Sequence, residues 1–406
     1  PDLSPLMPAM RPVIGRALSK DPADRQPDAV TLLRELAAAA DISLKNEPVA
    51  ARESYLLAAR FVGRKQELGQ LQMALQAAQR GCGAAWLISG ESGVGKSRLL
   101  EELRSSALIS GVLSARGQAV PGGTAYHLWQ EVLKLLALQV PLSDLEAGVI
   151  ATILPDLPRL LERELLAPQE LDAPSARLRL LHVVGEVLER LPETALVLLE
   201  DLQWADGASL TLLSHLTTSA SARRLLVIAT CRSEESPALP ESLPQLRKLP
   251  LLRLARPDME ALCESMLGRT GQDPTLVDLI ARETEGNTYF MVEVVRALAA
   301  ESGSLADIGR SGLPQRVAAG GIEEVLKRRL SWVPMELRPL LDLAAVAGRQ
   351  IDLPLMCQLM PQAEVQLREL ADLGIIELYI QRWRFCHDKL RDRVCDAVSP
   401  SEKKRL

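Results

Sequence analysis

The sequence predicts an α/β fold in which a parallel β-sheet carries helices on both faces, followed by helices alone and then by helices with a β-hairpin. Three observations lead to this prediction. Short apolar runs alternate with longer amphipathic stretches up to about residue 254, only helical periodicity follows, and two short strand-like runs occur near residue 380. Short apolar strands that alternate with helices are typical of parallel sheets with crossover connections.

The composition restricts the class of protein. The chain has 406 residues, enough for several domains, and its 47% hydrophobic and 24% charged residues are typical of globular proteins. The net charge of -5 argues against a dedicated nucleic-acid or membrane-surface binder. No apolar run approaches the ~20 residues of a membrane helix. Six scattered cysteines without a CxxC pair predict reduced core thiols. We therefore expect a cytoplasmic protein.

The N-terminal segment, residues 1–40, is too short to bury a core of its own. Apolar residues recur at helical spacing over residues 30–37, after a helix start at Pro27-Asp28. We interpret this segment as the end of a domain that begins before Pro1, with an ordinary helical hairpin as the alternative. Residues 41–57 are polar and aperiodic, which predicts a linker.

Residues 58–254 are assigned to the α/β domain. The candidates for its buried strands are residues 85–89, 195–199 and 225–230. Each is a short apolar run followed by a longer stretch with helical periodicity, which predicts a parallel sheet with crossover helices.

The C-terminal part of the chain is expected to form two smaller domains. Residues 255–310 show three amphipathic helical faces and predict an all-α helical lid. Residues 311–398 combine further helices with "GIIELYIQRWRFCH", which indicates two short strands around a turn and then a helix, as in a winged-helix domain. Residues 399–406 begin a further region.

The strongest motif is "GESGVGKS", which fits G-x-x-x-x-G-K-[ST] between an apolar strand and an amphipathic helix. It consists of Gly90, Glu91, Ser92, Gly93, Val94, Gly95, Lys96 and Ser97. The glycines let backbone N–H groups face a phosphate at a helix N-terminus, the lysine reaches the β- and γ-phosphates, and the serine hydroxyl coordinates Mg²⁺. We count Arg98, the next residue, among the nucleotide-binding candidates. The motif predicts an α/β P-loop NTPase that binds ATP or ADP with Mg²⁺.

A second motif, "ALVLLEDLQWAD", resembles a Walker B strand that ends in Glu200 and Asp201. Such a strand places two carboxylates beside the phosphate loop. One can hold the metal, together with Ser97, and the other can orient or deprotonate the attacking water. The usual order makes Glu200 the metal-side acid and Asp201 the base, but the reverse division stays open.

Arg232 ends "LLVIATCR", the apolar run that follows the acidic pair. A guanidinium at this position can reach the γ-phosphate and respond to its loss. The order of the three motifs favours this sensor role over that of an ordinary surface arginine.

With these motifs in order, the chain resembles the signal transduction ATPases with numerous domains, an AAA-like group related to Orc1/Cdc6 proteins, of the type attached to bacterial Ser/Thr kinases and adenylate cyclases. "FVGR" is similar to the adenine-side motif of that family, which implies nucleotide contacts for Val62, Gly63 and Arg64. Residues 1–40, through "RALSKDPADR", resemble the end of a kinase C-lobe, where Arg25 would brace the activation segment through an ion pair with a glutamate.

Two further positions depend on this resemblance. His387 in "WRFCHDKLRDRV" matches a winged-helix histidine that contacts the β-phosphate of bound ADP, and a simple helix cap is the alternative. "TEGNTYFMVEVVRAL" matches the lid segment of the family, but Thr288 stands where many relatives carry proline.

The resemblance implies a nucleotide-gated signalling switch that hydrolyses ATP slowly, with Lys96, Glu200, Asp201 and Arg232 as catalytic residues. Its partners would be other domains of the same polypeptide, namely a kinase domain and C-terminal sensor repeats, and nucleotide-dependent self-association would be consistent with it. No membrane partner is expected.

Two alternatives belong to other classes. A ring-forming AAA+ motor would need an arginine finger and pore loops, which no motif in the sequence marks. A DNA-binding transcriptional regulator could use the winged helix, but the acidic net charge makes DNA an unfavourable partner.

Overall fold

The computed structural model describes residues 60–165, 167–218, 223–302, 329–348, 350–379 and 382–399, together with residues 3, 7–19, 21, 24–26, 29–40, 308, 326–327 and 403. Four predicted features lie outside the described residues. They are the linker at residues 41–57, the helix start at residues 27–28, the beginning of the winged-helix domain at residues 311–325 and the hairpin turn at residues 380–381. Most of residues 399–406 lies outside them as well.

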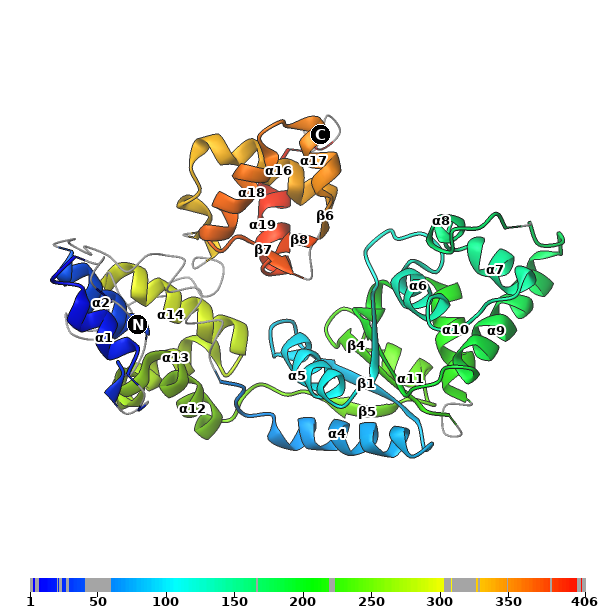
Figure 1. Ribbon diagram of the computed structural model, residues 1–406, viewed down its shortest axis with the longest axis horizontal. Helices are drawn as coiled ribbons and strands as arrows, with labels where there is room; N and C mark the ends of the chain where they lie inside the picture. Colours follow the sequence, from blue (N-terminus) through cyan, green and yellow to red (C-terminus); the bar gives the residue numbers. More distant parts are fainter. Residues whose placement is uncertain are drawn as a thin grey trace.

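Five parallel strands form the central sheet in the order β2–β3–β4–β1–β5 (Figure 1). They are β1 (Ala84–Gly90), β2 (Leu113–Gln118), β3 (Ala195–Glu200), β4 (Leu225–Arg232) and β5 (Arg247–Pro250). The three strands expected from apolar runs are β1, β3 and β4, in the middle of the sheet. The sequence did not indicate β2 and β5 because they are edge strands with polar residues such as Arg116, Gln118 and Lys248.

Helices cover both faces of the sheet because successive strand residues point to opposite sides. Ile88 and Ile228 pack with α4 and α5 on one face, whereas Leu87 and Val227 pack with the helices of the other. The helices of this domain are α4 (Lys65–Gln79), α5 (Lys96–Ile109), α6 (Gln130–Ala137), α7 (Asp144–Ala151), α8 (Leu157–Leu160), α9 (Ala173–Glu189), α10 (Gly207–Thr218) and α11 (Leu239–Ser242). The carboxyl ends of the buried strands therefore meet at one edge, where the phosphate loop begins.

Three helices follow the sheet domain and share a core of their own. They are α12 (Arg256–Leu267), α13 (Pro274–Thr284) and α14 (Thr288–Ser302). Met259, Met266, Ile280 and Leu298, which the helical spacing placed on apolar faces, are buried together. The start of α13 is capped by Asp273, whose carboxylate accepts from the Thr275 amide at 2.9 Å.

The described residues 329–399 form a further unit, the C-terminal module. It contains α16 (Arg338–Ala347), β6 (Gln350–Ile351), α17 (Leu353–Leu359), α18 (Ala363–Asp372), β7 (Ile376–Tyr379), β8 (Arg382–Phe385) and α19 (Asp388–Ala397). The two predicted strands pair antiparallel as β7 and β8, and the short β6 joins them in the order β6–β8–β7. Trp383 and Phe385 lie in the core of the module.

The N-terminal segment contains α1 (Arg11–Ala17) and α2 (Ala29–Ala39). Arg16 pairs with Glu35 at 3.0 Å and holds the two helices together, and the Nε of Arg25 donates to the Ser19 carbonyl at 3.0 Å. None of the described helices combines the length and apolarity needed to cross a membrane.

All six cysteines are free thiols, but one of them does not lie in a core. Cys82 is exposed, contrary to the expectation of core thiols, because it lies in the turn between α4 and β1.

Candidate functional site

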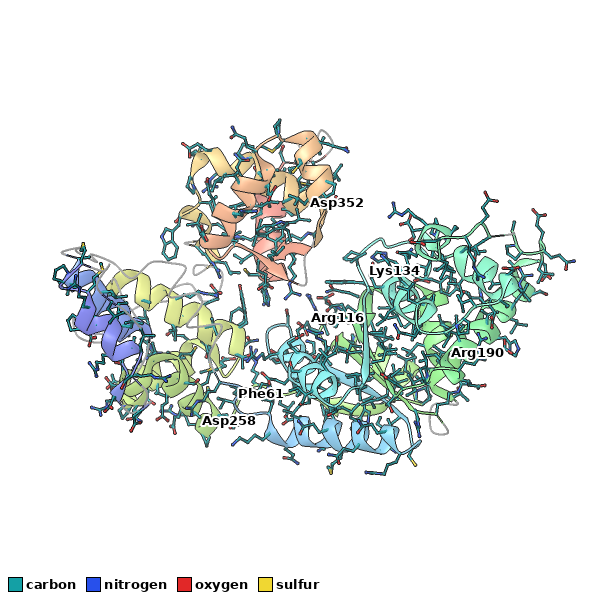
Figure 2. All side chains as sticks on the ribbon, viewed as in Figure 1. Phe61, Arg116, Lys134, Arg190, Asp258 and Asp352 are labelled. Atoms are coloured by element: carbon teal, nitrogen blue, oxygen red, sulfur yellow. The ribbon has the colours of Figure 1, made fainter. Side chains whose placement is uncertain are left out.

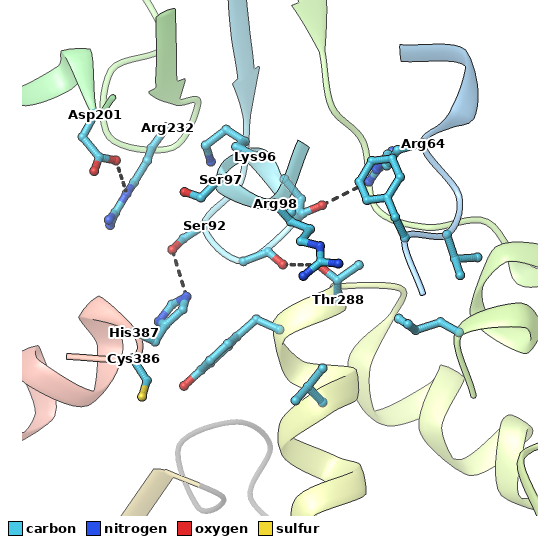
Figure 3. Close-up of a pocket in the computed structure, with 18 of the residues that line it drawn as sticks. Arg64, Ser92, Lys96, Ser97, Arg98, Asp201, Arg232, Thr288, Cys386 and His387 are labelled. Carbon is cyan, nitrogen blue, oxygen red and sulfur yellow. Dashed lines mark hydrogen bonds and ion pairs between the residues drawn. The ribbon is translucent and has the colours of Figure 1, made fainter. Parts of the chain in front are cut away.

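The phosphate loop connects β1 to α5 at the carboxyl edge of the sheet (Figure 3). Gly95 has φ 101° and Gly93 has φ 85°, a left-handed backbone that residues with a Cβ rarely adopt. The turn that these glycines permit brings backbone N–H groups to the N-terminus of α5, where the helix dipole favours an anion. The backbone of the motif therefore has a geometry that suits an anion.

Lys96 lies inside this loop and is buried. Its Nζ donates to the carbonyl oxygens of Gly90 at 2.7 Å and Glu91 at 2.8 Å. Burial lowers the pKa of Lys96, and the charge of Asp201 opposes that shift. A bound phosphate would supply the negative charge that favours the ammonium form.

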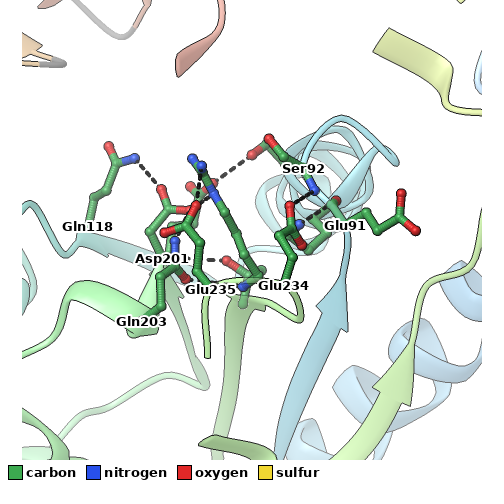
Figure 4. A network of polar contacts seen from close by, with 12 residues as sticks. Glu91, Ser92, Gln118, Asp201, Gln203, Glu234 and Glu235 are labelled. Atoms are coloured by element: carbon green, nitrogen blue, oxygen red, sulfur yellow. Dashed lines mark hydrogen bonds and ion pairs between the residues drawn. The ribbon is translucent and has the colours of Figure 1, made fainter. Parts of the chain in front are cut away.

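The two carboxylates at the end of β3 have different partners, and Figure 4 shows Asp201 beside Gln118. The Ser97 hydroxyl donates to Oε2 of Glu200 at 2.8 Å, and Arg116 forms an ion pair with the other oxygen of Glu200. Asp201 has φ 59°, which turns its side chain toward the Nε2 of Gln118 at 2.8 Å and the Nε2 of Gln203 at 3.3 Å. Glu200 is thus directed to the serine of the loop. Asp201 is directed to Gln118 and Gln203 and lines the cavity.

Arg232 ends β4, the strand that lies between β1 and β3. Its Nε is 3.7 Å from Oδ1 of Asp201, and its Nη1 donates to Glu235 at 2.6 Å. The guanidinium also lies 4.7 Å from the ring centroid of Trp204. The order of the strands therefore brings Arg232 beside the acidic pair.

The donor set fits Mg²⁺ with a nucleotide and not a site made by the protein alone. Among the described residues, no group of three or more His, Cys, Asp or Glu side chains could hold a metal ion. Mg²⁺ prefers oxygen ligands and is commonly held by one or two protein groups plus substrate phosphates. The Ser97 hydroxyl and the Glu200 carboxylate, 2.8 Å apart, are ligands of this kind.

Arg64 of "FVGR" braces the phosphate loop. Its guanidinium donates to the carbonyl oxygens of Val94, at 3.3 Å, and Leu252, and pairs with Glu67 at 3.2 Å. The neighbouring Gly63 has φ 72°, a left-handed backbone, and a Cβ there would lie 2.8 Å from Cβ of Asp258. These contacts make Arg64 a support of the loop backbone.

The side walls of the site beside Arg64 combine apolar and charged residues. Phe61 and Val62 line the cavity. Phe61 lies in the segment that precedes α4 (Figure 2). At the mouth, Arg98 is half exposed and pairs with Glu102 at 2.9 Å.

The start of α14 is bound to the phosphate loop by hydrogen bonds. The Asn287 side chain donates to the Ser92 carbonyl at 2.9 Å, and the Thr288 hydroxyl and Tyr289 amide both donate to the Gly93 carbonyl. A proline at position 288 could not donate the hydroxyl bond. Thr288, the departure from the family pattern, therefore adds a contact to the loop.

His387 reaches the same loop from the C-terminal module. It is the N-cap of α19, and its Nδ1 accepts from the Lys389 amide at 3.1 Å. In the neutral ring the proton is then on Nε2, which lies 3.4 Å from the Ser92 hydroxyl (Figure 3). The helix-cap role and the position at the phosphate loop are both present.

These elements enclose a cavity of about 340 Å³. Its charged lining consists of Arg60, Arg64, Lys96, Arg98, Asp201, Arg232 and Arg384. The excess of positive side chains suits a polyphosphate. The loop serine, the start of α14 and His387 complete the wall, so three separate segments of the chain meet at one site.

Some contributing residues were missed by the sequence reasoning. Tyr289 and Arg384 lie within the quoted segments "TEGNTYF" and "WRFCH", and their closeness to Thr288 and His387 was the available signal. Arg116 and Gln118 on the edge strand β2 carry no such signal. Glu234, which accepts from the Ser92 amide at 2.7 Å, was not singled out either (Figure 4).

Comparison with known proteins agrees with this geometry. Residues 60–228 match the AAA ATPase domain. The match implies a P-loop nucleoside-triphosphate hydrolase and includes the loop, Glu200 and Asp201. Arg232, α14 and His387 lie beyond its end.

One curated relative aligns over most of the chain. It is an uncharacterized protein of Rhizobium meliloti (strain 1021), 26% identical over 381 residues, or 85% of this chain. The alignment covers 36% of that protein, so the chain spans about a third of the length of the relative.

Two solved structures illustrate the similarity of fold. The signal transduction ATPase with numerous domains from Pyrococcus horikoshii, which has a tetratricopeptide repeat sensor, is 16% identical with a TM-score of 0.51. That alignment covers 86% of this chain and 44% of the other. The Aeropyrum pernix Orc1 protein in complex with DNA is 16% identical with a TM-score of 0.40, covering 87% and 97% of the two chains. The Pyrococcus horikoshii protein shares the fold of this chain, whereas the Orc1 protein is less similar in shape.

Proposed function

We propose that this chain is an ATP-dependent signalling switch that binds Mg-ATP, hydrolyses it slowly and retains ADP in a closed state. The proposal rests on one observation. The phosphate loop, the start of α14 and His387 of the C-terminal module line the same cavity. A ligand in this cavity would touch all three segments. Loss of the γ-phosphate could then change how these segments bind to one another.

The residues supply the parts of a hydrolytic site. Lys96 would neutralise charge on the β- and γ-phosphates, and Arg232 would contact the γ-phosphate. Asp201 would orient a water and take its proton as the water oxygen attacks the γ-phosphorus and the bond to the bridging oxygen breaks. Ser97 and Glu200 would hold Mg²⁺, which supplies further neutralisation of the phosphate charge when bound.

Replacing Asp201 by asparagine should lower ATP hydrolysis by about 100-fold or more, because the amide cannot accept the proton. Nucleotide affinity should change little, since Lys96 and the loop amides remain. Phosphate release under single-turnover conditions measures the rate of hydrolysis. Titration with a fluorescent ATP analogue measures the nucleotide affinity. Asp144→Asn, an exposed carboxylate on α7 that pairs with Arg163 at 3.5 Å, is the matched control. Undiminished hydrolysis by Asp201→Asn would assign the base elsewhere.

The nucleotide content of the purified protein tests the switch directly. We expect near-stoichiometric ADP after denaturation and release. His387→Ala should lose this ADP, because removal of a hydrogen bond to a charged group weakens binding by about 10- to 100-fold. His182→Ala changes an exposed histidine on α9 that pairs with Glu186, and should retain the nucleotide. An empty site in a protein that turns over ATP rapidly would favour a ring-forming motor.

The wider architecture belongs to the same proposal. Residues 58–254 would be the ATPase domain, residues 255–310 its lid and residues 311–398 a winged-helix unit. A preceding kinase domain, of which residues 1–40 are the end, would be the output, joined through residues 41–57. We also propose a cytoplasmic location, self-association that depends on the nucleotide, and C-terminal sensor repeats as partner domains. A DNA titration at low and moderate salt tests the alternative of a DNA-binding regulator.

A further inference from the structure

We propose that Tyr289 is a positioning residue that holds the His387 ring at the phosphate loop and thereby sets how long ADP stays bound. The inference rests on the proposed function, because it concerns the retention of ADP assigned to His387. It adds to that function a residue on α14 that acts through the histidine of another unit.

Tyr289, at the start of α14, contacts both the phosphate loop and the C-terminal module. Its ring is stacked on the imidazole of His387, with ring centroids 3.7 Å apart and planes 20° apart. Its amide donates to the Gly93 carbonyl of the phosphate loop at 3.0 Å. The same side chain packs against the core of the C-terminal module. Tyr289 therefore connects the loop, α14 and the module directly.

The ring of Tyr289 is itself fixed by its surroundings. Phe290 contacts it edge to face, with centroids 5.4 Å apart and an interplanar angle of 65°. The phenol oxygen is buried and has no hydrogen-bond partner among the described residues. Burial raises the pKa of Tyr289 well above its usual range, and Glu293 adds to this shift, so the phenol is neutral. The aromatic face, and not the hydroxyl, is the part that contacts His387.

Two of the contacts of His387 bear on the orientation of its ring. The bond from the Lys389 amide to Nδ1 fixes one edge of the ring. The terminal torsion of histidine is broad, so that bond restricts the plane of the ring only within the tolerance of hydrogen-bond geometry. Stacking on Tyr289 fixes the plane, and together the two contacts direct Nε2 toward the Ser92 hydroxyl at 3.4 Å.

A double-mutant cycle on ADP release tests the inference. Tyr289→Leu should accelerate dissociation of a fluorescent ADP analogue by about 3- to 10-fold, the range expected for one aromatic pair. Tyr289→Phe should leave the rate within about twofold, because the ring is kept. In a His387→Ala background, Tyr289→Leu should cause no further acceleration.

The outcomes separate this inference from the function on which it rests. If Tyr289→Leu accelerates release equally with and without His387, Tyr289 acts independently of the histidine and the inference fails while ADP retention by His387 stands. If His387→Ala alone leaves the release rate unchanged, both fail. Trp332→Leu is the matched control, because it removes an exposed aromatic ring that does not line the cavity.

A spectroscopic measurement covers the case in which Tyr289→Leu does not fold. The chain has four histidines, so the ring protons can be assigned by substitution. In the parent protein and in Tyr289→Phe, the His387 signal should be shifted upfield by the stacked ring. A His387 signal at an unshifted position in the folded parent protein would overturn the inference.

Discussion

Replacing Lys96 by methionine is expected to lower ATP hydrolysis by about 1000-fold, the largest loss that removal of a single phosphate contact usually causes. Methionine fills the space of the lysine stem but cannot donate to a phosphate. The buried ammonium donates to the carbonyl oxygens of Gly90 and Glu91, which are uncharged, so its replacement by an apolar group should not unfold the protein. Phosphate release measures the loss of hydrolysis, and circular dichroism of the same sample shows whether the fold is retained.

Lys248→Met is the matched control for Lys96→Met. Lys248 lies on the edge strand β5 and pairs with the exposed Glu241 at 2.6 Å, away from the loop. The Lys248→Met variant should hydrolyse ATP at the parental rate. Near-parental hydrolysis by Lys96→Met would mean that another cation of the cavity, such as Arg232 or Arg384, carries the phosphate contact.

Glu293→Ala should destabilise the protein by about 3–5 kcal/mol, because it leaves buried arginines without their counter-charge. Glu293 is buried on α14 and forms ion pairs with Arg296 and Arg329. Burial alone would raise the pKa of Glu293, but the two arginines hold it below its usual range. Arg329 also donates to the Gly374 carbonyl, so this cluster joins α14 to the C-terminal module. Urea unfolding followed by tryptophan fluorescence measures the loss.

The control for Glu293→Ala is Glu364→Ala. Glu364 pairs with Arg368 at 2.6 Å on α18, but both side chains are more than half exposed. Exposed pairs at this spacing contribute only about 0.5 kcal/mol. Equal losses from the two substitutions would show that the buried cluster has no special role in joining α14 to the module.

The sequence predicted those parts of the structure that depend on residues close together in the chain. The loop from Gly90 to Ser97 is contiguous, β1 before it is an apolar run, and its neighbours β3 and β4 are fully buried, so pattern and spacing were sufficient to predict these three strands. The helical faces of α12, α13 and α14 follow the same logic. In each case a few neighbouring residues determine the local structure.

Contacts between distant segments could not be predicted in this way. The separate orientations of Glu200 and Asp201 depend on Arg116 and Gln118, which come from an edge strand with no apolar pattern. Arg64, which was predicted to contact the nucleotide, lines the cavity, and it also donates to backbone carbonyls that only the folded chain brings together. A motif identifies a residue type at a position, whereas its partners depend on the packing of the whole domain.

Gly93 is subject to two independent demands. Its left-handed backbone shapes the phosphate loop, and a Cβ at this position would lie 2.7 Å from Oδ1 of Asn287 and 2.8 Å from Cβ of Tyr289. If the phosphate loop changed so that residue 93 no longer needed a left-handed backbone, a larger residue would still not fit there. The start of α14 would exclude its side chain. Evolution of the nucleotide loop and evolution of the interdomain contact are coupled through the absence of one side chain.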